Sequence, residues 1–315
     1  MSQNGNQQPF INPYLAVVLA VVAASFASIF TKLADAPAII IAFYRIGITV
    51  LILAPFMLRN TNVQTVRSLS LKAWGLALLA GLFLALHFAT WITSLEYTSI
   101  ASSTVLVTMQ PLFVVAGGVY LLGERISRNA LLGGALALAG SVLIGINDFQ
   151  ISGQAILGDI LAFAGAMFVA GYVLIGRVLR AQMDVLPYTF IVYGASAVTL
   201  FLFALVFDTP FGPYPALSWL YFTALALVPT IFGHSVLNWA LKYVKAAVVS
   251  VSILGEPVGA SILAYFIFGQ VPTLLQVTAG VMIIGGLTCF LLCSRSEDRR
   301  QSLGRENAAE RCCQQ

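Results

Sequence analysis

The sequence predicts an all-α integral membrane protein with ten transmembrane helices, built as two inverted five-helix repeats. Three observations predict this fold: the composition, a series of apolar runs separated by short polar segments, and an internal similarity between the two halves. Of the 315 residues, 59% are hydrophobic and 9% are charged, whereas a soluble domain carries about a quarter charged residues. Lipid is therefore the expected surrounding of most of this chain.

The apolar runs have the length of membrane-crossing helices. A helix rises about 1.5 Å per residue, so a hydrocarbon core of about 30 Å requires about 20 apolar residues. Continuous apolarity also favours helices over barrel strands, in which apolar and polar residues alternate. Ten such runs occur, at residues 13–34, 38–58, 73–95, 98–121, 130–147, 158–178, 187–207, 216–241, 246–268 and 273–293.

The basic residues predict the orientation in the membrane. Of the 16 Lys and Arg residues, fourteen fall on one side if the ten runs are traced in order, and Lys32 lies alone on the other. Segments rich in Lys and Arg stay in the cytoplasm. The sequence therefore predicts a multi-pass protein of the cytoplasmic, or inner, membrane with both termini in the cytoplasm.

The two halves resemble each other at an offset of 146 residues. Residues 95–144 align with 241–290, matching Pro111 with Pro257 and Gly123 with Gly269. Each half holds five runs, and an odd number makes the second copy enter the membrane from the opposite face. The predicted organisation is a cytoplasmic tail (1–12), a first repeat (13–147), a second repeat (158–293) and a disordered cytoplasmic tail (294–315).

Two pairs of matching stretches resemble the drug/metabolite transporter superfamily, in particular its EamA-type members. They are residues 102–111 with 121–125 in the first copy, and residues 251–257 with 268–270 in the second. The resemblance covers residues 13 to 293 and implies ten helices in two inverted repeats and the transport of amino acids, other metabolites or drugs. Gln270 departs from the pattern, because it replaces the loop acid that the first copy has as Glu124.

Glu256 is the first candidate for a functional residue. Ionisable groups at membrane depth are costly and mark transport pathways by default. Glu256 precedes Pro257, which has no N–H to donate, whereas its repeat partner Gln110 precedes Pro111 and cannot titrate. Glu256 is expected either to carry a proton or to form a structural hydrogen bond, and Gln110 to be structural or to line the cavity. Both prolines are candidate bending points for gating, although membrane helices also tolerate proline without such a role.

Arg45 and the neighbouring Tyr44 lie in the second run, where the corresponding stretch of the second copy, at Tyr193, has no base. A lone arginine inside the membrane must pair or reach water. Arg45 is expected to meet Glu256, a substrate carboxylate or a lipid phosphate, and Tyr44 to share its role.

A polar pair recurs in the third and eighth runs. His87 and Trp91 are four residues apart and share a helix face, and His234 and Asn238 repeat the spacing. The recurrence favours a shared cavity lining, while interhelical hydrogen bonds and an interfacial tryptophan remain the alternative.

These observations favour a secondary transporter that exports amino acids or similar amphipathic metabolites by alternating access, with proton coupling left open. An uptake carrier or facilitator of the same fold is the alternative, and a channel or intramembrane enzyme is disfavoured. No cofactor, metal site, nucleotide-binding motif or nucleic-acid surface is expected. The expected partners are a small-molecule substrate and membrane lipid. A homodimer and acylation of Cys312 or Cys313 stay open.

Overall fold

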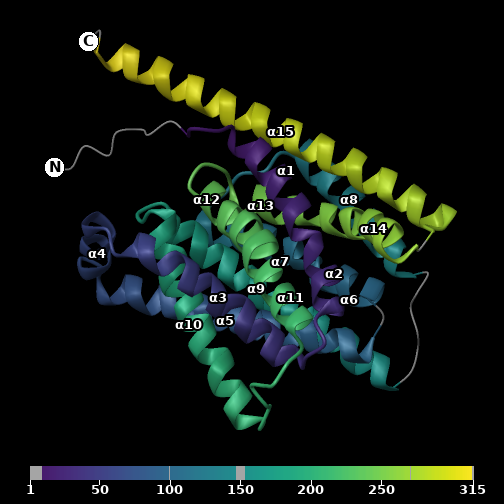
Figure 1. The fold of residues 1–315 in the computed structure, drawn as a ribbon. Coiled ribbons are helices and arrows are strands. Elements are labelled where there is room, and N and C mark those ends of the chain that lie inside the picture. Colours follow the sequence, from purple (N-terminus) through teal and green to yellow (C-terminus); the bar gives the residue numbers. More distant parts are fainter. Residues whose placement is uncertain (1–8, 99, 147–152, 270, 314–315) are drawn as a thin grey trace.

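The computed structural model describes residues 9–98, 100–146, 153–269 and 271–313, and this part of the chain is helical and contains no strand. The helices are packed side by side into a bundle (Figure 1). In chain order they are α1 (Pro13–Ala24), α2 (Phe26–Leu33), α3 (Ala38–Met57), α4 (Asn60–Arg67), α5 (Leu71–Tyr97), α6 (Ile100–Val107), α7 (Gln110–Leu122), α8 (Arg128–Ile146), α9 (Gly153–Arg180), α10 (Val185–Val206), α11 (Ala216–Leu225), the π-helix η1 (Ala226–Ser235), α12 (Val236–Ala240), α13 (Ala246–Ser252), the 3₁₀ turn η2 (Ile253–Gly255), α14 (Glu256–Phe268) and α15 (Leu274–Cys313).

Nine helical segments are long and apolar enough to cross a membrane, within the residues whose side chains are described. Each corresponds to one of the ten predicted runs. The remaining run, 130–147, is represented by α8, of which the residues with described side chains, Arg128–Leu143, form a shorter apolar helix than the other nine. The multi-pass membrane architecture is therefore confirmed, and the number ten stays a prediction.

The C-terminal segment differs from the prediction. The sequence predicts disorder after residue 293, but the backbone of α15 continues as one helix to Cys313. Residues 294–313 are polar yet contain Leu, Ala, Arg, Glu and Gln, which favour the helical backbone. These residues extend a helix that its apolar part has already nucleated, which removes the main cost of helix formation.

The fourth helix of each repeat is interrupted at the same place. In the first repeat α6 ends at Val107 and α7 begins at Gln110, and in the second α13 ends at Ser252 and α14 begins at Glu256. A proline occupies the first turn of α7 and of α14, where its missing N–H costs least. Both helices then end at a glycine in the left-handed conformation, Gly123 (φ 66°) and Gly269 (φ 67°).

Corresponding helices of the two repeats pack against each other. The second helices, α3 and α10, are in contact, and so are the fifth helices, α8 and α15. Small residues bring α8 and α15 together: a Cβ atom added to Gly286 would lie 2.5 Å from the backbone nitrogen of Ala137. The third helix of the first repeat, α5, contacts α9, the first helix of the second repeat. The third helix of the second repeat, which comprises α11, η1 and α12, contacts α1 and α2, the first helix of the first repeat.

Candidate functional site

Arg45 lies at the centre of a buried polar cluster. Its side chain is 0% exposed, and Nε donates a hydrogen bond of 2.8 Å to Thr230 Oγ1. The guanidinium carbon stands 4.5 Å from the centre of the Phe88 ring, a cation–π contact. Nη1 and Nη2 are buried and have no hydrogen-bond partner among the described residues. Arg45 therefore keeps two donors available inside the bundle.

The partner of Arg45 is positioned by the π-helix η1. Pro229 lies inside η1 and has no N–H to donate. Two side-chain hydrogen bonds reflect the wider turns of the π-helix, because each joins residues five positions apart. Thr230 Oγ1 donates to the Leu225 carbonyl (2.7 Å), and Ser235 Oγ donates to the Thr230 carbonyl (3.2 Å). Short π-helical segments recur at functional sites, and this one aims Thr230 at Arg45.

Glu256 faces this cluster from the break in the ninth membrane segment. It is the first residue of α14 and is half-buried. It interacts electrostatically with the Arg45 guanidinium but forms no direct ion pair with it. Glu256 is one of the three partners that the sequence allows for Arg45, and their pairing stays a prediction.

Both histidines lie beside the same cluster. His87 Nδ1 is 3.0 Å from the Gly165 carbonyl, so Nδ1 carries the hydrogen, and the ring stacks on Trp91 with a centroid distance of 6.0 Å. The His234 ring contacts Phe88 edge-on at 5.7 Å and interacts electrostatically with Arg45. Phe88 therefore links these aromatic side chains to the guanidinium.

Asn238 joins the cluster through tyrosines. Its Nδ2 donates to the hydroxyls of Tyr172 and Tyr193, the latter at 3.3 Å, and the Tyr193 hydroxyl lies 3.1 Å from Ser235 Oγ. Tyr172, Thr230 and Tyr193 are cluster residues that were not predicted from the sequence. Tyr193 lies in the stretch of the second repeat that corresponds to Tyr44 and Arg45, and this correspondence is a signal that could have identified it. Tyr172 and Thr230 carry no such signal.

The other predicted residues lie apart from Arg45 or have no contact that joins them to it. The Tyr44 hydroxyl donates to the Phe211 carbonyl at 2.7 Å, and its ring stacks on Phe222. Tyr44 therefore holds the loop before α11. Gln110 is 2% exposed, and its Oε1 has no hydrogen-bond partner in the described part of the chain. Pro111 and Pro257 begin the second segments of the two interrupted helices.

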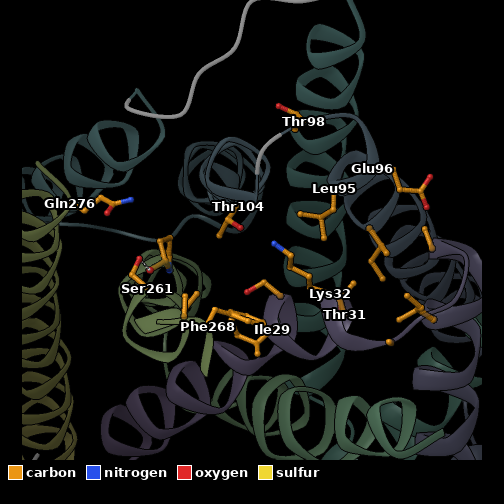
Figure 2. A pocket seen from close by; sticks show the side chains of 18 of the residues that line it. Ile29, Thr31, Lys32, Leu95, Glu96, Thr98, Thr104, Ser261, Phe268 and Gln276 are labelled. Atoms are coloured by element: carbon orange, nitrogen blue, oxygen red, sulfur yellow. Dashed lines mark hydrogen bonds between the residues drawn. The ribbon is translucent and has the colours of Figure 1, made fainter. Parts of the chain in front are cut away.

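A cavity of about 720 Å³ extends from the bend at Pro257 to the surface (Figure 2). Its walls come from α2, the start of α3, α5, α6, α14 and the start of α15. Lys32 and Glu96 in this wall are exposed, so the cavity opens at the end of the bundle where α5 ends. Its volume is in the range of small-molecule sites, about 300–1,000 Å³.

The opposite end of the bundle is closed by Glu124. This residue follows α7, and its Oε1 accepts a 2.9 Å hydrogen bond from the backbone N–H of Ala246 at the start of α13. The same oxygen lies 3.4 Å from Nε of Arg177, whose Nη1 donates to the Leu241 carbonyl. These contacts tie the first repeat to the second.

Comparisons with known proteins agree with this architecture. The model of the EamA-like transporter family matches residues 11–146 and again residues 156–292. The chain belongs to this family. The two matches of the EamA-like model correspond to the two repeats seen in the sequence and contain every residue of the cluster.

Relatives cover nearly the whole length of this EamA-like chain. An uncharacterized transporter of Archaeoglobus fulgidus is 28% identical over 272 residues, or 86% of this chain and 93% of the relative. The pseudopaline exporter of Pseudomonas aeruginosa is 25% identical over 281 residues, or 88% and 95% of the two chains. A crystal structure of a protein with 20% identity superimposes with a TM-score of 0.76, covering 90% of this chain and 98% of that one. The last comparison shows the fold alone.

Proposed function

We propose that this protein is a secondary transporter that exports small amphipathic metabolites, such as amino acids, across the cytoplasmic membrane by alternating access. The observation that carries the proposal is the contrast between the two ends of the bundle. One end opens into a cavity that reaches the bend at Pro257, and the other is closed by Glu124. A carrier needs a central site with a gate on either side.

The direction of the interrupted helices supports an inverted arrangement of the two repeats. The end of α7 meets the start of α13 at Glu124 and Ala246. At the cavity the order is reversed. Phe268, at the end of α14, and Thr104, in the first segment α6 of the other interrupted helix, line the same cavity. The two fourth helices therefore run in opposite directions. Ten spans follow if α8 also crosses the membrane, as its contact with the spanning α15 supports.

Export is favoured by two considerations. The pseudopaline exporter is a relative over most of this chain. The closed end carries Arg177 and Lys242, and the rule that basic loops stay inside assigns this end, together with both termini, to the cytoplasm. The cavity then faces outwards, in the geometry that releases a substrate.

Glu256 and Arg45 are proposed to couple a proton to this movement. A deprotonated Glu256 attracts Arg45, and protonation of Glu256 removes this attraction next to Pro257, which lines the cavity. Glu256 directly follows η2, the turn that separates α13 from α14. A change in the protonation of Glu256 would therefore act at this turn. Protonation would thereby alter substrate binding and helix geometry together.

Counterflow in proteoliposomes tests the function. Wild-type protein is assayed against a panel of radiolabelled amino acids and related metabolites at two pH values, beside Glu256→Gln. The expected result is that accumulation driven by a pH gradient disappears in Glu256→Gln, whereas exchange of substrate survives, because the amide keeps the shape of the side chain without a titratable proton.

Glu96→Gln provides the control, since Glu96 is an exposed acid at the cavity mouth. It should keep the gradient-driven accumulation. Wild-type pH dependence in Glu256→Gln would remove the proton role, and absence of counterflow for every solute would remove the carrier function.

A further inference from the structure

Lys32 is a basic side chain in the wall of the cavity. It lies in the last turn of α2, and Nζ stands 5.8 Å from the centre of the Phe268 ring. Figure 2 shows the side chain extending into the cavity towards Thr104. Among the described side chains, no carboxylate forms an ion pair with Lys32. Lys32 is exposed, so its charge faces the solvent of the open cavity and is available to a solute that enters it.

Three buried hydroxyl groups in the same wall have no hydrogen-bond partner among the described atoms. They belong to Ser28, Thr31 and Thr104, which are 3%, 6% and 4% exposed. Hydroxyls in helices commonly donate to the carbonyl one turn earlier, as Thr49 does to Arg45. A buried hydroxyl without a partner costs about 1–3 kcal/mol, so three in one cavity wall indicate a ligand that supplies the missing bonds.

The two repeats explain why Lys32 is left without an acid. Arg177 lies in the last turn of α9, the first helix of its repeat, as Lys32 lies in the last turn of α2. Glu124 neutralises Arg177 at the closed end. In the sequence Gln270 takes the position of Glu124 in the other repeat, so the acid that would match Lys32 is replaced by an amide.

We propose that Lys32 and these hydroxyls form a subsite for the carboxylate of the transported metabolite. The ammonium group pairs with the carboxylate, and the hydroxyls of Thr31 and Thr104 donate to its oxygens. The apolar part of the metabolite packs on Ile92 and Phe268 in the same wall. A single lysine matches a monoanion better than a phosphate, which commonly engages the bidentate fork of arginine. This inference rests on the proposed function and names its substrate class.

Binding to purified protein in nanodiscs tests the subsite. The probes are L-leucine, L-phenylalanine and benzoate, each compared with its amide, which lacks the negative charge. The acids should bind and the amides should not. Lys32→Gln should weaken binding of the acids about tenfold or more, the effect of losing a hydrogen bond to a charged group. Lys32→Arg should retain it, because the charge remains.

Lys72→Gln is the matched control, since Lys72 is an exposed lysine at the other end of α5, and it should bind like wild type. Equal binding of acids and amides, no binding of any acid to the wild type, or unchanged binding in Lys32→Gln would each overturn the subsite. The measurements are made in phosphatidylcholine discs with and without phosphatidylglycerol. An effect of Lys32→Gln that requires phosphatidylglycerol would assign Lys32 to a lipid headgroup and also overturn the proposal.

Counterflow of the same acids separates this inference from the proposed function. Substrate exchange that proceeds equally in wild type and Lys32→Gln contradicts the subsite but leaves the carrier intact. Acid binding that depends on Lys32 without any counterflow contradicts the carrier but leaves the subsite intact.

Discussion

The buried Arg45 needs contacts that offset the loss of its hydration. A buried charge that loses its partner costs about 3–5 kcal/mol, whereas removing both charges is often nearly neutral. Arg45 is 0% exposed, and Thr230 supplies only one of the hydrogen bonds that the guanidinium can make. The cation–π contact with Phe88 and the electrostatic attraction of Glu256 add to this compensation, so the pair of Arg45 and Glu256 is expected to contribute to stability.

This pairing predicts the stability of variants. Arg45→Gln should lower the free energy of unfolding by about 3 kcal/mol, and Arg45→Gln with Glu256→Gln should restore part of that loss. Thermal unfolding in detergent of the two single variants and the double variant measures the coupling. Arg59→Gln, at an exposed arginine, is the control and should unfold like wild type. Additive effects of the two substitutions would show that the residues do not interact.

The sequence predicted this part of the site because polar groups at membrane depth are conspicuous. Arg45 and Glu256 stand out on that ground, and His87 and His234 stand out because their spacing recurs in the two halves. The four side chains lie near one another, and their role in transport stays a prediction. Tyr44 was grouped with Arg45 because the two are adjacent, but neighbours on a helix point about 100° apart, and Tyr44 faces the loop before α11 instead.

Other contributors carry no signal in a single sequence. Thr230 resembles any small membrane hydroxyl until the π-helix brings it to Arg45. The subsite hydroxyls belong to the same class, and only the structure shows that they lack partners.

At the scale of elements, the apolar runs predicted the helices well and the interruptions less well. The breaks before Gln110 and Glu256 follow from the prolines. The separation of α1 from α2 at Ser25 and the π-helix η1 were not predicted, since both depend on packing between helices. The helical C-terminal segment was missed because a polar composition was taken as the mark of disorder.

Two adjacent glycines test the packing of α8 against α15. A Cβ atom on Gly286 would lie 2.6 Å from the Gly133 carbonyl oxygen, whereas one on Gly285 would meet nothing within 4 Å. Gly286→Ala should therefore destabilise the protein by about 1–3 kcal/mol. Gly285→Ala should be neutral or stabilising by up to about 1 kcal/mol, because alanine favours the helix. The apparent melting temperatures of both variants in detergent provide the comparison, and equal values would contradict the close contact.

At the scale of the whole molecule, Glu124 is expected to hold one end of the carrier closed. Glu124→Ala removes both the acceptor for the Ala246 N–H and the ion pair with Arg177. The loss of a hydrogen bond to a charged group, about 1.5–3 kcal/mol, should increase opening of this end about tenfold or more.

The opening is measurable through Val244, a side chain that is 2% exposed at the closed end. In a background with all four cysteines replaced by serine, Val244→Cys should react with a polar maleimide about tenfold faster or more when Glu124 is alanine. Asp184→Ala breaks the exposed Lys242 pair at the same end and should leave the rate unchanged. Equal rates in all three proteins would exclude Glu124 as a gate.

The covalent joining of the two repeats has a consequence for the chemistry that the site can hold. A symmetric homodimer presents every residue twice, so its central axis would receive two arginines and two glutamates or none. In this chain the first repeat supplies Arg45 and the second supplies Glu256, while the stretch that corresponds to Arg45 has no base and the counterpart of Glu256 is Gln110. Gene fusion thus frees the copies to diverge, and a single cation can face a single acid across an axis that would otherwise duplicate both.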